Sequence, residues 1–90
     1  SEDDVLRREV IRHIRTFFNI EFDIFSKKYS KNFKDYFSKE LDNLKSFEKD
    51  ELIKINENNI TLTPLGEHFS PQIANVFDIY NDQKFYDRAL

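Results

Sequence analysis

The chain has 90 residues, a formal net charge of −3 and no cysteine, which fits one domain with a core that needs no disulfides. The lack of cysteine excludes a thiolate-held metal or iron–sulfur cluster and a cysteine nucleophile within these residues. The negative charge argues against a nucleic-acid surface, and no apolar run is long enough to span a membrane.

The chain begins with the acidic stretch Ser-Glu-Asp-Asp and has neither an initiator Met nor the apolar region of a signal peptide. We therefore expect a fragment of a longer protein, and the absence of cysteine suits a cytoplasmic one. The first predicted element is a helix over residues 1–18. Ser1 or Asp3 can cap it, and its acidic first turn suits the positive end of the helix dipole. Its expected inner stripe comprises Leu6, Val10, Ile14 and Phe17, widened by Ile11 and Phe18.

Arg8, Arg12 and Arg15 lie opposite this stripe. They form either a solvated face or a docking surface for an acidic domain or an anionic substrate. Arg7 falls at the edge of the buried stripe, and a partly buried guanidinium has to be paired. We expect a bridge from Arg7 to a carboxylate such as Asp3 or Asp78.

Residues 19–30 are less regular and predict a loop followed by a short helix over residues 24–29. Asn32 can cap a third helix that extends to about Lys49. Glu51 then stands where a glycine more often supplies the left-handed backbone that ends a helix. We expect glutamate instead of glycine at this position to cost about 1 kcal/mol of stability.

Residues 52–56 and 59–63 alternate well enough for two short strands joined as a hairpin. Thr63 and Pro64 begin a helical turn over residues 64–69, and a second helix follows Pro71. Its expected apolar stripe consists of Ile73, Val76, Phe77 and Tyr80, and the tail over residues 81–90 either prolongs this helix or frays. The predicted fold is mainly α with a small β-hairpin: a winged-helix-like three-helix core plus two C-terminal helical segments in a single domain, residues 1–90.

Five sequence blocks together resemble one known family. They are Asp3-Asp4-x-x-Arg7-Arg8-x-Val10-Ile11, Phe33-x-x-Tyr36-Phe37, Leu52-Ile53, Thr63-Pro64-Leu65-Gly66 and Ile73-Ala74-x-Val76-Phe77-Asp78-x-Tyr80. Their order and spacing resemble the C-terminal domain of oxygen-independent coproporphyrinogen III oxidases. The sequence departs from the family pattern at Glu51, where the family commonly has Gly, and at Glu67 and Pro71-Gln72, which replace an Arg and an Arg-Asn pair. Any role of those family residues is therefore not carried over.

The resemblance implies a parent enzyme of haem biosynthesis that oxidatively decarboxylates coproporphyrinogen III to protoporphyrinogen IX. Such enzymes use S-adenosylmethionine and a [4Fe-4S] cluster held by three cysteines of an upstream barrel. It implies that this chain packs on that barrel and helps to shape the tetrapyrrole site. We favour this oxidase branch over the related haem-chaperone branch, and we expect no activity from the isolated chain.

No catalytic, cofactor-binding or metal-binding residue is predicted, because His13 and His68 stand alone and the single glycine cannot form a phosphate loop. The candidates for interdomain or substrate contacts are Arg7, Arg8, Phe77, Asp78 and Tyr80. The alternative for Phe77, Asp78 and Tyr80 is a purely structural role. In that case the two aromatic rings lie in the core and Asp78 forms a bridge to Arg7. The alternative function is a stand-alone winged-helix protein- or DNA-interaction module. The third helix opposes the DNA version, because its five lysines are balanced by five acidic residues over residues 31–50.

Overall fold

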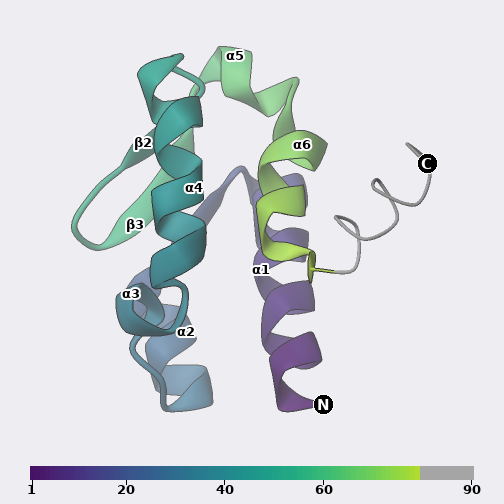
Figure 1. Ribbon diagram of the computed structural model, residues 1–90, viewed down its shortest axis with the longest axis vertical. Coiled ribbons are helices and arrows are strands. Elements are labelled where there is room, and N and C mark those ends of the chain that lie inside the picture. The colour runs from purple at the N-terminus through teal and green to yellow at the C-terminus, as the bar shows by residue number, and fades with distance from the viewer. Residues whose placement is uncertain (80–90) are drawn as a thin grey trace.

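The computed structural model describes residues 1–79 and confirms a mainly helical fold with a small antiparallel sheet (Figure 1). The elements in chain order are α1 (Glu2–Phe17), β1 (Asn19–Glu21), α2 (Phe22–Tyr29), α3 (Phe33–Tyr36), α4 (Ser38–Lys49), β2 (Ile53–Ile55), β3 (Asn59–Leu62), α5 (Pro64–Glu67), α6 (Ser70–Ala74) and the 3₁₀ helix η1 (Asn75–Phe77). Helix α6 packs along α1, and α5 crosses above them toward α4 and the sheet (Figure 1).

Helix α1 begins as the sequence predicts. The Ser1 hydroxyl accepts a hydrogen bond from the Asp4 amide at 3.3 Å and forms a capping box with the Asp4 side chain. The inner stripe is confirmed at Leu6, Val10 and Ile14, which are fully buried. It is wrong at Phe17, which is 52% exposed. The chain turns at Phe18, which has a left-handed backbone, and enters β1. This strand packs against α1 in place of the Phe17 side chain.

The sheet has three strands in the order β1-β3-β2, so the predicted hairpin of β2 and β3 is correct but incomplete. The region expected to be a loop supplies β1, whose Ile20 lies opposite Ile60 in an antiparallel register. A three-residue strand has almost no alternation for a pattern to reveal. Its pairing with a segment about forty residues later in the chain decides its conformation.

The third predicted helix is divided into α3 and α4 at Phe37, whose backbone dihedrals are −108° and 31°. Asn32 caps α3 as predicted, since its side chain accepts from the Asp35 amide at 3.0 Å. Phe37 is fully buried, with its ring 5.0 Å from Phe33 and 5.1 Å from Phe77. Aromatic packing against the C-terminal segment therefore prevails over a continuous helix at this point.

The segment after β2 and β3 is fastened by Thr63. Its hydroxyl donates to the Glu51 carbonyl at 2.8 Å and accepts from the Gly66 amide at 3.0 Å. A methyl group on Gly66 would lie 1.8 Å from the Leu52 carbonyl oxygen, so this position has room only for glycine. Glu51 has φ of 63°, which confirms the predicted left-handed helix end.

The C-terminal stripe is confirmed at Ile73 and Phe77, which are fully buried, while Val76 packs at the edge of the core. Helix α6 begins at Ser70, so Pro71 lies in its first turn, where proline is tolerated. Tyr80 and the predicted tail over residues 81–90 lie outside the described residues.

Candidate functional site

Arg7 joins three parts of the fold that are distant in sequence. Its Nε donates to Asp3 at 2.8 Å, and its Nη1 donates to the Glu40 carboxylate at 2.8 Å and to the Phe77 carbonyl at 3.1 Å. The guanidinium therefore ties α1 to α4 and to η1. The predicted bridge to Asp3 is confirmed, and the planar donor fork of arginine explains why one side chain can serve three acceptors.

The hydrogen bonds of this cluster shift the pKa values of its members. The Tyr36 hydroxyl donates to Asp3, and this bond, followed by the bond from Arg7, holds the pKa of Asp3 below its usual value. The same bond to Asp3 raises the pKa of Tyr36 to about 12. Burial alone lowers the pKa of Arg7, but its bonds to Glu40 and Asp3 outweigh this and raise it. At neutral pH the cluster therefore holds a cation and an anionic Asp3.

Two members of the cluster were missed from the sequence, Tyr36 and Glu40. Glu40 is only 7% exposed, although it is charged. It lies three residues after Phe37 and four before Leu44, both of which are fully buried, so its spacing places it within the apolar face of α4. A carboxylate in an apolar stripe is a signal that a cation has to reach it.

A hollow of about 260 Å³ lies beside this cluster, between α1 and the end of η1. Its lining comprises Asp4, Arg7, Arg8, Ile11, Phe77, Asp78 and Ile79. Four of the five predicted contact residues thus meet around one hollow, while Tyr80 lies outside the described residues. Arg8 and Ile79 are exposed at its rim, whereas the Phe77 side chain is fully buried. At this hollow Arg8 therefore presents its side chain to solvent, whereas Phe77 does not.

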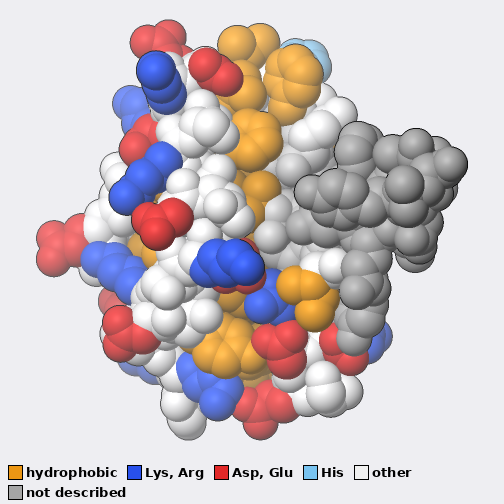
Figure 2. Space-filling view, in the orientation of Figure 1, with side chains coloured by type: hydrophobic (Ala, Val, Ile, Leu, Met, Phe, Trp, Pro, Cys, Tyr) orange, Lys and Arg blue, Asp and Glu red, His pale blue; other side chains and the backbone are white. Residues whose placement is uncertain are grey.

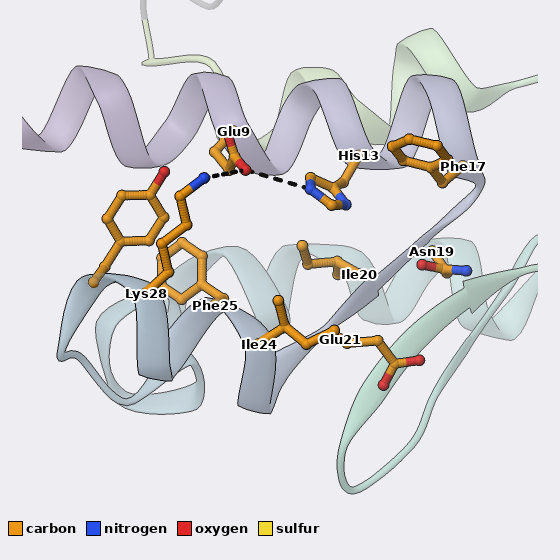
Figure 3. A pocket seen from close by; sticks show the side chains of 10 residues that line it. Glu9, His13, Phe17, Asn19, Ile20, Glu21, Ile24, Phe25 and Lys28 are labelled. Atoms are coloured by element: carbon orange, nitrogen blue, oxygen red, sulfur yellow. Dashed lines mark hydrogen bonds and ion pairs between the residues drawn. The ribbon is translucent and has the colours of Figure 1, made fainter.

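A second, more apolar hollow of about 330 Å³ lies on the other side of α1, facing β1 and α2 (Figure 3). At one end Lys28 and His13 point toward the Glu9 carboxylate from 3.1 and 3.4 Å. Burial raises the pKa of Glu9, but the hydrogen bond from Lys28 and nearby charges outweigh it, so the pKa is lowered. Between its polar ends the hollow is walled by the apolar side chains Phe17, Ile20, Ile24 and Phe25. We call it the α1–α2 groove.

Within residues 1–79, no group of three or more His, Cys, Asp or Glu side chains is placed to hold a metal ion. Nor does any helix there have the length and apolar character needed to cross a membrane.

Comparison with known proteins identifies the family. The model of the HemN C-terminal domain matches residues 1–68, which include Arg7 and Arg8. The chain belongs to the HemN C-terminal domain family. Oxygen-independent coproporphyrinogen III oxidases are 32% identical over 92 residues in Helicobacter pylori strain 26695 and 34% identical over 98 residues in Synechocystis. Each alignment covers 100% of this chain, but it covers only 20% and 21% of the relative.

A solved structure supports the same family membership. The coproporphyrinogen III oxidase HemN from Escherichia coli, described as a radical SAM enzyme, superposes with a TM-score of 0.86 at 30% identity. The match covers 89% of this HemN C-terminal domain and 18% of that enzyme, so the chain spans about a fifth of the length of its relatives.

The DNA-binding alternative is not supported, because the matching curated proteins are described as oxidases. The surface agrees with this, since basic and acidic side chains are interspersed over the face that carries α4 (Figure 2). Two pairs illustrate the balance: Lys45 lies 3.1 Å from Asp42 on α4, and Lys31 lies 3.1 Å from Glu2. Phosphate binding needs cations that are not balanced in this way.

Proposed function

We propose that this chain is the C-terminal accessory domain of an oxygen-independent coproporphyrinogen III oxidase. The parent enzyme would act in the cytoplasm and convert coproporphyrinogen III to protoporphyrinogen IX. The observation that carries the proposal is the TM-score of 0.86 to the E. coli enzyme at 30% identity over 89% of this chain. A likeness in both sequence and structure favours common descent over a fold reached independently.

The chemistry of the proposed reaction belongs to the remainder of the parent chain. With no cysteine, these 90 residues have no thiolate for a [4Fe-4S] cluster, so they do not fit the cofactor of the proposed parent. S-adenosylmethionine would be used at that cluster, in the catalytic barrel. The role left for this domain is to pack on the barrel and to complete the wall of the tetrapyrrole site.

The hollow beside Arg7 is our candidate for that contact. Arg8 is an exposed cation at its rim, and Ile79 is a 44% exposed apolar side chain beside it. A guanidinium next to an apolar surface suits either an acidic residue of the barrel or a propionate of the tetrapyrrole, because both are carboxylates. Arg7 is held by its three acceptors, so it would position this rim rather than contact the partner itself.

The first test is to sequence the coding DNA upstream of the Ser1 codon. A continuous frame of several hundred codons that contains Cys-x-x-x-Cys-x-x-Cys supports the proposal. A start codon directly before Ser1 overturns it.

The second test uses the purified full-length enzyme and follows the conversion of coproporphyrinogen III. We expect Arg8→Ala to raise KM or lower kcat by about tenfold, the effect of losing one charge-assisted contact worth about 1.4 kcal/mol. Arg15→Ala is the matched control, because Arg15 is an exposed arginine two turns further along α1 and does not line the hollow. Equal activity of the two variants would remove Arg8 from the contact.

A further inference from the structure

The two edges of the sheet differ. The Phe22 amide donates to the Asn58 carbonyl and the Leu62 amide donates to the Phe18 carbonyl, both at 2.9 Å. In an antiparallel ladder alternate residues bond to the same neighbour, so residues 18, 20 and 22 face β3. Asn19 and Glu21 therefore direct their backbone amides away from the sheet.

At the β2 edge a side chain covers one of the outward amides. The outward amide of Ile55 donates to the Glu48 carboxylate of α4 at 2.8 Å. The β1 edge has no counterpart, because within residues 1–79 no hydrogen bond reaches the amides of Asn19 and Glu21. An open strand edge is a template for pairing with another extended segment.

The open edge borders the α1–α2 groove, which Asn19 and Glu21 both line (Figure 3). Two large apolar side chains at this groove are exposed to solvent: Phe17 is 52% exposed and Ile24 is 64% exposed. Ile20 and Phe25 form its buried floor. Exposed apolar side chains gathered around a hollow mark an interaction surface, whereas single ones do not.

We propose that an extended segment of the catalytic part of the parent chain adds to β1 as a fourth strand and places an apolar side chain in the α1–α2 groove. This inference rests on the proposed function and names a second docking surface of the domain, on the other side of α1 from the hollow beside Arg7. The source follows from length, because the relatives are about five times as long as this chain and carry the rest in the same polypeptide.

The chemistry of the segment follows from the groove. The free amides call for backbone carbonyls at two positions, which an extended segment presents and a helix does not. The nearby carboxylate of Glu9 is already bonded to Lys28, so the groove does not require a cation from its occupant. An uncharged strand with a Val, Ile, Leu or Phe side chain directed into the groove meets both conditions.

Amide hydrogen exchange on the full-length protein tests this, resolved to single residues across positions 18–22. We expect the Asn19 and Glu21 amides to exchange at least about 100-fold more slowly than unprotected amides. In an Ile24→Ser variant their protection should fall by at least about tenfold, while the amides of Ile20 and Phe22 stay protected by β3. Leu65→Ser is the matched control, because Leu65 is a 55% exposed apolar residue on α5 that does not line the groove.

Two results would overturn the inference. One is free exchange of Asn19 and Glu21 beside a protected Ile20 in a full-length protein that carries the catalytic part. The other is loss of protection in Ile24→Ser and Leu65→Ser alike, which would indicate general destabilisation. Both are distinguishable from failure of the proposed function, which is seen as a missing catalytic part or an inactive full-length enzyme.

Discussion

The Arg7 cluster gives the sharpest test of what holds this domain together. In an Arg7→Met variant the chain keeps a side chain of similar length but loses the guanidinium. Glu40, which is 7% exposed, then loses the cation 2.8 Å from its carboxylate, and the Phe77 carbonyl loses its donor. Removing one partner of a buried ion pair costs about 3–5 kcal/mol, because the remaining charge is left in a poorly solvating site.

A loss of this size is a large fraction of the total stability of a small domain, which is about 5–15 kcal/mol. Urea denaturation followed by far-ultraviolet circular dichroism measures it. Arg15→Met is the matched control on the same helix, and as an exposed substitution it should change the free energy of unfolding by less than about 0.5 kcal/mol.

The double variant Arg7→Met with Glu40→Leu separates the two parts of the effect. If the cost of the single change is the unpaired Glu40 carboxylate, removing both charges should restore most of the lost stability, since apolar replacements of buried pairs are often neutral. The reasoning is refuted if Arg7→Met costs less than about 1 kcal/mol. It is also refuted if the double variant is no more stable than the single one.

Three further predictions concern stability and use the same denaturation assay. Gly66→Ala should lower the free energy of unfolding by at least about 1–3 kcal/mol, because the added methyl group would lie 1.8 Å from the Leu52 carbonyl oxygen. A higher free energy of unfolding, as expected for Gly→Ala in an unhindered helix, would contradict this packing. Glu51→Gly should raise the free energy of unfolding by up to about 1 kcal/mol, because φ is 63° at Glu51. Lys49→Gly, two residues earlier in α4, should lower the free energy of unfolding by about as much. Equal effects of the two changes would contradict a left-handed backbone at Glu51. Folding lowers the pKa of Asp3 and raises that of Tyr36 to about 12. The free energy of unfolding should therefore fall as the pH drops below about 3.9 through the folded pKa of Asp3, and also as the pH rises from about 10 to 12. Tyr36→Phe should weaken both dependences, and an unchanged pH profile in this variant would count against the hydrogen bond between Tyr36 and Asp3.

Local chemistry determined several of the helix ends, and the sequence predicted those. Ser1, Asn32 and Thr63 cap helices with their own side chains, so each can be recognised within three residues of sequence. Glu51 adopts the left-handed backbone because α4 has to end before β2, whichever residue is present. The same reasoning predicted that Arg7 would be paired, since its position at the edge of an apolar stripe follows from helical spacing alone.

Three features depended on contacts between distant parts of the chain. Strand β1 forms because β3 offers it a hydrogen-bonding edge, the long helix is broken because Phe37 packs against Phe77, and Glu40 is buried because Arg7 reaches it from α1. Spacing along a sequence shows which face of an element is apolar, but not which other face will cover it. The bonds of Arg7 to Glu40 and to the Phe77 carbonyl, and the open edge of β1, could therefore be found only in the tertiary structure, where segments remote in sequence meet.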